Sequence, residues 1–312
     1  MSSEYMLQLH KRLTEKTYGD PPRTLSPTTA DAYIKTLFSL NDKQPFKSLA
    51  FLKKTDVIMK KLEGYAESTQ KTLLATLTSV LGMDAKNKKA YQFYHDKMIE
   101  KVATVKEADT AVKTETQKEN WITWEDVLKK QVELKETVEQ SINKKLPLSN
   151  SQFNHLLSYI MLSLYIDVPP RRNQDYLNMY VYKATKKDVV DSLPKDKNYV
   201  IIAGGEPKQF IYNIYKTSKT YGQQTMNIPP ILQTVLRYYL KRVANKAKEY
   251  KFLPFEKDNS ITRLLNKVFE KKIGSSMLRH IYLSSKYNIS EMKDDAKAMG
   301  HSVEEQKAYL KE

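Results

Sequence analysis

Apolar residues recur with helical spacing through the first third of the chain. Ser26 and Pro27 are typical of an N-cap and a first helical position, and apolar residues from Ala30 to Phe38 follow with the spacing of an α-helix. These patterns together predict a compact all-α domain over residues 25–105. The further helices of this domain are predicted over about 46–62, 68–81 and 87–105.

The residues on either side of this domain lack such a pattern. Residues 1–24 end in the breaker cluster Gly19-Asp20-Pro21-Pro22, which predicts an N-terminal arm rather than a packed element. Residues 106–120 are mainly Lys, Glu, Thr, Ala and Asp, and we interpret them as a linker. The apolar pattern returns at Trp121, so a second domain is predicted over 121–312.

The second domain begins with helices and then changes its period. Thr123 and Asp126 resemble a capping box that opens a helix to about Asn143. Between residues 198 and 229 the apolar residues follow a β-type pattern, which predicts a small antiparallel sheet in a mainly α fold. The predicted strands cover 199–202, 210–215 and 225–228, with turns at Gly204-Gly205 and Tyr221-Gly222, and the other helices cover 151–166, 231–248, 261–269, 275–287, 290–299 and 303 onward.

Composition adds a strong positive charge to this picture. The chain has 312 residues, with 52 Lys and Arg against 36 Asp and Glu, which gives a formal net charge of +16. Such an excess is typical of a partner that carries many phosphates, although solvated lysine-rich helix faces also produce it. The absence of Cys excludes disulfides, thiolate zinc sites and cysteine nucleophiles. No apolar run reaches the ~20 residues of a membrane span, so we expect an intracellular protein without a membrane partner.

Four short segments carry groups that bind phosphate or transfer protons. Each has an ordinary explanation on its own, because paired arginines after a helix usually bind carboxylates or helix ends, and lysines in a turn are usually solvated. The segments are Pro169 to Tyr176 with the pair Arg171-Arg172, the predicted hairpin Lys216 to Gly222, Ser276 to His280, and Met299 to Ser302 followed by Tyr309.

In combination, the order of these residues resembles the catalytic domain of the tyrosine recombinase and integrase family. The specific part is Leu278-Arg279-His280 together with Met299-Gly300-His301-Ser302 and the closing Tyr309. The resemblance covers 121–312, and the helical domain before the linker is similar to the core-binding domain of that family. The Pro-Pro-Arg-Arg variant is most similar to integrase-like proteins of large DNA viruses and related mobile elements.

Carrying the family's roles across requires two choices. The family has an acidic residue three positions after its first catalytic arginine, which Arg172 and Asp175 satisfy and Arg171 does not. The catalytic lysine lies at a hairpin and is commonly followed by Thr and Gly, a pattern that Lys219 fits better than the alternate, Lys216. The implied catalytic set is Arg172, Lys219, Arg279, His301 and Tyr309, and the residues expected to contact DNA beside it are Lys216, Arg171, Ser276 and His280.

The sequence departs from the family at two places. Ser276 stands where the family often has a histidine, three residues before the second arginine. A hydroxyl still donates a hydrogen bond to a phosphate oxygen but is a poor base at neutral pH. Only three residues follow Tyr309, fewer than in relatives that exchange a C-terminal helix between protomers.

The resemblance implies a site-specific recombinase or integrase that breaks and rejoins DNA through a 3′-phosphotyrosyl intermediate. Arginines and histidine would stabilise the phosphate in the transition state, so neither metal nor cofactor is expected. The implied partners are double-stranded DNA and further copies of the chain, as a dimer or tetramer on DNA. A type IB topoisomerase with the same chemistry and a catalytically inactive architectural DNA-binding protein remain the alternatives.

DNA binding by the first domain is a less specific expectation. Its lysines can follow the phosphates of a duplex, and polar side chains of the same helices can reach base edges. Any one of these lysines can equally belong to a solvated face. The candidates are Lys53, Lys54, Lys60, Lys61, Lys86, Lys88 and Lys89.

Overall fold

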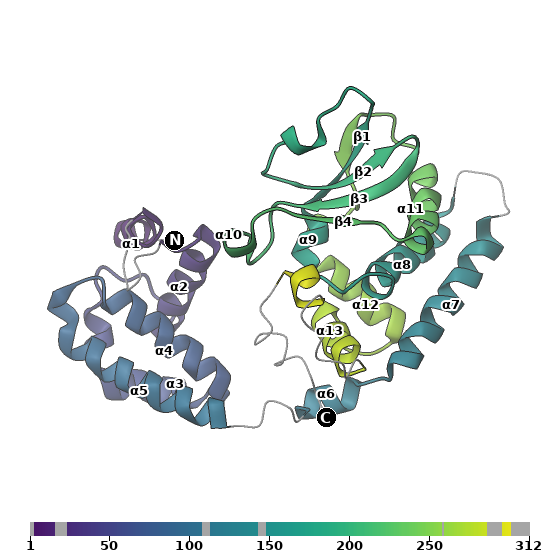
Figure 1. Cartoon of the computed structure of the whole chain (residues 1–312). Helices are drawn as coiled ribbons and strands as arrows, with labels where there is room; N and C mark the ends of the chain where they lie inside the picture. The colour runs from purple at the N-terminus through teal and green to yellow at the C-terminus, as the bar shows by residue number, and fades with distance from the viewer. Residues whose placement is uncertain are drawn as a thin grey trace. The chain divides into compact units, whose positions relative to one another are not determined.

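The chain divides into two compact units, residues 1–109 and 110–312, which we describe separately (Figure 1). The structure is a computed structural model that describes residues 3–15, 24–107, 113–142, 148–257, 259–285 and 295–300. The boundary between the units falls inside the segment 106–120 that the sequence marks as a linker.

The first unit is helical. Its main helices pack around a core of leucines and aromatic residues, and α4 and α5 pack against each other. The Ser26 hydroxyl accepts a hydrogen bond from the Thr29 amide at 3.2 Å, which confirms the predicted N-cap of α2. The predicted helix over 46–62 is wrong in part, because the structure has two shorter helices there, η1 and α3, which are separated at Lys54. The elements are α1 (Glu4–Glu15), α2 (Pro27–Leu40), η1 (Ala50–Lys53), α3 (Thr55–Glu63), α4 (Glu67–Leu81), η2 (Ala85–Asn87) and α5 (Lys88–Glu107).

The predicted N-terminal arm contains a packed helix, so this expectation is corrected. Met6, Leu9 and Leu13 of α1 are buried in the core of the first unit. Their spacing places all three on one face of the helix, which is enough to hold it against α2. The breaker cluster at 19–22 lies outside the described residues.

Helices of the second unit surround a central apolar helix, α8 (Asn150–Ile166), from which ten residues in succession are buried. Reciprocal hydrogen bonds between Thr123 and Asp126 confirm the capping box that opens α7 (Trp124–Ile142). The predicted linker is corrected at its end, because Thr114 caps a short helix, α6 (Glu115–Asn120). The remaining helices are α9 (Asn173–Leu177), η3 (Val190–Ser192), α10 (Ser218–Tyr221), α11 (Pro230–Val243), α12 (Ser260–Phe269) and α13 (Ser275–Ser284). No helix in the described ranges is long and apolar enough to cross a membrane.

The sheet is mixed rather than purely antiparallel, which corrects the predicted fold class. Its strand order is β4-β3-β2-β1-β5, and β1 runs parallel to β2 while the other neighbours are antiparallel. The strands β2 and β4 match the first and third predicted β-type runs, whereas the second run, predicted over 210–215, overlaps β3 only over 210–212. The strands are β1 (Met179–Ala184), β2 (Asn198–Ala203), β3 (Glu206–Tyr212), β4 (Gln224–Asn227) and β5 (Glu249–Lys251).

The two faces of the sheet follow the alternation of its strands. Val181, Val200 and Phe210 face the helices and join the main core of this unit. Tyr199 and Ile201 lie in a separate cluster on the other side, together with Val190 and Leu193 from the connection between β1 and β2. Helix α11 packs against both β3 and α8 on the helical side (Figure 1).

Asn198, at the start of β2, ties the sheet to α9. Its amide nitrogen donates to the carbonyl oxygens of Asp175 and Ile214, and its amide oxygen accepts from the backbone of Asn213 and Ile214, all at 2.8 Å. The side chain is fully buried, so water cannot replace these four bonds. Asn198 therefore fixes the end of β3 and the helix that follows the two arginines.

We predict that Asn198→Ala lowers the free energy of unfolding by about 3 kcal/mol, because it leaves buried backbone groups without partners. Urea denaturation measures the change. Asn178→Ala, which truncates an exposed asparagine next to the same strand system, is the control and stays within about 0.5 kcal/mol of the wild type. An equal loss in both variants would contradict the role assigned to Asn198.

Candidate functional site

Arg171 and Asp175 form a buried ion pair just after the two prolines that end α8. The Nε atom of Arg171 donates to an Asp175 carboxylate oxygen at 2.8 Å, and each side chain is only 1% exposed. The backbone of Arg172 is extended and caps α9, which places Asp175 within the first turn of the helix. The ion pair thus joins Asp175 to Arg171, whereas the family pattern in the sequence selects Arg172, three positions before Asp175, as the catalytic arginine.

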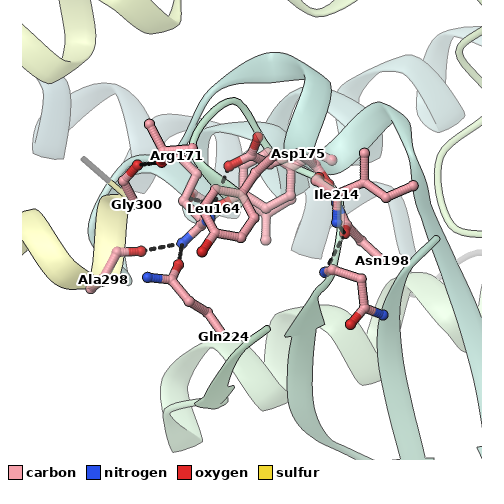
Figure 2. A network of polar contacts seen from close by, with 12 residues as sticks. Leu164, Arg171, Asp175, Asn198, Ile214, Gln224, Ala298 and Gly300 are labelled. Atoms are coloured by element: carbon pink, nitrogen blue, oxygen red, sulfur yellow. Dashed lines mark hydrogen bonds and ion pairs between the residues drawn. The ribbon is translucent and has the colours of Figure 1, made fainter. Parts of the chain in front are cut away.

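Arg171 also contacts two other parts of the chain (Figure 2). Its Nη1 atom donates to the Gln224 side-chain oxygen at 2.9 Å and to the carbonyl oxygen of Ala298. The guanidinium carbon lies 3.8 Å from the centre of the Tyr212 ring, within reach of a cation–π interaction. One buried cation therefore connects α9, the strands β3 and β4, and the segment 295–300.

Two further arginines act on the same carboxylate. Burial raises the pKa of the Asp175 carboxyl, and the positive charges of Arg171, Arg172 and Arg279 oppose this rise. Arg172 is half-buried at the start of α9, and Arg279 is 6% exposed on α13. Three guanidiniums thus contribute positive charge at one carboxylate, and guanidiniums are well suited to bind anionic groups.

The predicted lysine hairpin is the connection between β3 and β4, which we call the lysine loop (residues 216–222). It contains the short helix α10 in place of a simple turn, and Lys216 and Lys219 are both exposed on it. The Tyr215 hydroxyl donates to the Gly222 carbonyl at 2.7 Å and so closes the base of the loop. Gly222 has a φ of +66°, which favours glycine at this position.

The segment 295–300 is bound to both the lysine loop and α13. The Gln224 side-chain nitrogen donates to the Lys297 carbonyl at 2.6 Å, and the Thr217 hydroxyl donates to the Gly300 carbonyl. Met299 is buried in a cluster with Tyr282 and Leu283 of α13. The described structure thus gathers the arginine pair, the lysine loop, the Arg279 helix and the residues that precede His301 in the sequence. Figure 2 shows the part of this network around Arg171, Gln224, Ala298 and Gly300.

The structure describes only some of the predicted site residues, and these differ in their exposure to solvent. His301 and Tyr309 lie outside the described residues. Ser276 is exposed and His280 half-buried, and the two lie four residues apart on α13. Sequence analysis missed Thr217, Gln224 and Tyr215, whose only signal is their place within or beside the lysine loop. Arg171 is enclosed rather than presented at the surface for DNA.

A groove in the first unit carries a second concentration of charge. It has a volume of about 610 Å³ and lies where η1, η2 and the first turn of α5 meet. The backbone amides at the start of α5 add partial positive charge to the same place. Four lysines line it, namely Lys53, Lys86, Lys88 and Lys89. These residues form a basic groove suited to a phosphate backbone.

Comparison with family models, curated proteins and solved structures finds no match for this chain. Within the part of the chain that the structure describes, no group of three or more His, Cys, Asp or Glu side chains is placed to hold a metal ion.

Gly300 provides a test of how tightly the segment 295–300 is held. It has a φ of +72°, and an added Cβ would lie 2.9 Å from the Tyr215 ring and 3.1 Å from Nη2 of Arg171. We predict that Gly300→Ala detaches the segment, with faster hydrogen exchange at 297–300 as the readout. The positive φ alone costs about 1 kcal/mol, and the clash adds to it.

The control is Gly205→Ala, because Gly205 has a φ of +80° but open space around its Cα. This variant carries the cost of the backbone conformation without the clash. It should leave exchange at 297–300 unchanged. Equal protection of the segment in Gly300→Ala and in the wild type would contradict the described packing.

Proposed function

We propose that this protein breaks and rejoins DNA strands through a phosphotyrosyl intermediate, as a site-specific recombinase or integrase. The nucleophile of this reaction is Tyr309. The phosphate is held by Arg172, Arg279 and His301, and Lys219 supplies a proton. Double-stranded DNA is the substrate, and a dimer or tetramer on DNA is the working assembly.

The observation that supports this proposal is that segments far apart in the sequence come together around Asp175 and Gly300. Arg172 and Arg279 both act electrostatically on Asp175, although 107 positions separate them in the chain. The lysine loop is bonded to Gly300, the residue immediately before His301. These contacts support the proposal because Arg172, Arg279 and the lysine loop, three of the segments that resemble a recombinase in the sequence, meet around Asp175 and Gly300.

Two arginines suit a phosphodiester because its transition state gathers charge on the non-bridging oxygens. Each guanidinium donates several hydrogen bonds in a fixed plane and can stabilise that charge. In the cleavage step the Tyr309 oxygen forms a bond to phosphorus while the bond from phosphorus to the 5′ oxygen breaks. The phenol proton passes to a base or water, for which His280 and His301 are the imidazole candidates in this part of the sequence.

A lysine on a short exposed loop suits the departing 5′ oxygen, which needs a proton as it leaves. Lys219 lies on α10, where its side chain is in solvent and can reach toward a bound duplex. The 3′-phosphotyrosyl bond keeps the energy of the broken ester, so attack by a 5′ hydroxyl restores the strand and releases Tyr309.

We predict that the protein forms a covalent adduct with a nicked suicide substrate in the presence of a chelator. Tyr309→Phe removes the attacking oxygen and should abolish the adduct, which denaturing electrophoresis detects. Tyr221→Phe is the matched control, because Tyr221 is a 41% exposed tyrosine on the lysine loop. An adduct that survives Tyr309→Phe, or that depends on Tyr221, would contradict the proposed nucleophile.

Tests on paired sites and on supercoiled plasmid, together with the adduct assay, separate the alternative functions. Exchange or joining of paired sites by an oligomer indicates a recombinase, and relaxation of any supercoiled plasmid by a monomer indicates a type IB topoisomerase. DNA binding without an adduct on cognate or supercoiled DNA indicates an architectural protein.

We also predict that the basic groove of the first unit binds duplex phosphates. Replacing Lys86, Lys88 and Lys89 by Gln should weaken binding to all sequences and reduce the salt slope of log K by roughly 2–3. Lys35, Lys71 and Lys97, which do not line the groove, supply a triple Gln variant with the same change in charge. Equal weakening in both variants would show that only net charge matters.

A further inference from the structure

We propose that Arg171 is a positioning residue that fastens the segment before His301 to the lysine loop, while its neighbour Arg172 binds the phosphate. This inference rests on the proposed function and refines it. It divides two adjacent arginines, which the sequence alone offers as alternates, into two different roles.

Arg171 donates its hydrogen bonds to partners within the protein. Its Nε is committed to Asp175, and its Nη1 to Gln224 and to the Ala298 carbonyl. One face of its guanidinium lies against Tyr212, and the side chain is 1% exposed. Its Nη2 has no hydrogen-bond partner among the described residues but is buried beside Gly300, so a DNA phosphate could reach Arg171 only if this packing opened and exposed the ion pair with Asp175, at a cost of several kcal/mol.

Residues beside Arg171 add further bonds to the segment 295–300. Gln224 accepts from Arg171 with its oxygen and donates to the Lys297 carbonyl with its nitrogen. Thr217, in the lysine loop, donates to the Gly300 carbonyl. Gly300 allows this close approach because it carries no Cβ against Tyr215 and Arg171. We call this set of contacts, made by Arg171, Thr217 and Gln224, the latch.

The latch joins the loop that carries Lys216 and Lys219 to the segment that leads directly into His301. If the lysine loop shifts when DNA binds, the segment 295–300 must shift with it or lose the bond from Thr217 to the Gly300 carbonyl. The latch therefore makes the placement of the C-terminal catalytic residues depend on the placement of the lysine.

The latch is tested by variants that remove its bonds but leave every catalytic cation in place. Thr217→Val and Gln224→Met remove the bonds to Gly300 and Lys297, and Thr225→Val and Gln223→Met make the same changes at exposed neighbouring positions. Each latch variant should raise hydrogen exchange at 297–300 and slow single-turnover adduct formation by roughly 3–10-fold. DNA affinity should stay within about twofold, because no phosphate ligand is changed.

The two arginines are separated by a substrate with a neutral methylphosphonate at the cleavage position. An arginine whose task is to neutralise the phosphate becomes dispensable on this substrate, so activity of Arg172→Ala should recover relative to wild type. Arg171→Lys should not recover, because its defect lies in the position of the segment 295–300. Recovery of Arg171→Lys together with failure of Arg172→Ala to recover would reverse the assignment and overturn the proposal.

Hydrogen exchange keeps this inference distinct from the proposed function. If the wild type forms no adduct on any substrate, the proposed function fails, and faster exchange at 297–300 in Thr217→Val and Gln224→Met still supports the latch. Unchanged exchange in both variants overturns the latch, whatever the activity. Faster exchange with an unchanged rate of adduct formation overturns the positioning role of Arg171.

Discussion

The guanidinium of Arg171 is a full positive charge held where 1% of its side chain meets solvent. Removing a charge from water costs several kcal/mol unless partners replace the lost hydration, and the surrounding chain supplies them. Asp175 gives the countercharge, Gln224 and Ala298 give acceptors, and Tyr212 gives an aromatic face. Because these partners belong to α9, to β3 and β4, and to the segment 295–300, satisfying one cation fixes three parts of the second unit.

Asn198 extends this constraint into the sheet. It binds the carbonyl of Asp175 and the backbone at the end of β3, so the ion pair and the base of the lysine loop share one rigid support. Arg172 and Arg279 also act electrostatically on Asp175. A buried arginine thus provides the geometry, and its neighbours bring guanidiniums that can bind an anionic group.

Much of the fold follows from local chemistry that a sequence reveals. Ser26-Pro27 and Thr123 with Asp126 begin helices as predicted, and Gly204-Gly205 forms the turn between β2 and β3, with both residues at positive φ. The strand β1 was missed although Tyr180 and Tyr182 alternate with Met179 and Val181, and with it the parallel pairing. The buried ion pair of Arg171 with Asp175 could not be predicted from the spacing, because the extended backbone of Arg172 stands between the two residues. Contacts such as Thr217 with Gly300 depend on tertiary packing and leave no local signal.

The positive residues behind the net charge of +16 have two separate roles in the proposed function. In the proposed function, lysines of the basic groove attract duplex phosphates in general, whereas Arg172 and Arg279 act on one phosphate. The most direct test is to trap the protein on a nicked substrate, digest both components, and identify the peptide that carries a nucleotide by mass spectrometry. The account predicts a 3′-phosphate linked to Tyr309. A linkage to another residue, or the absence of any linked peptide, would contradict it.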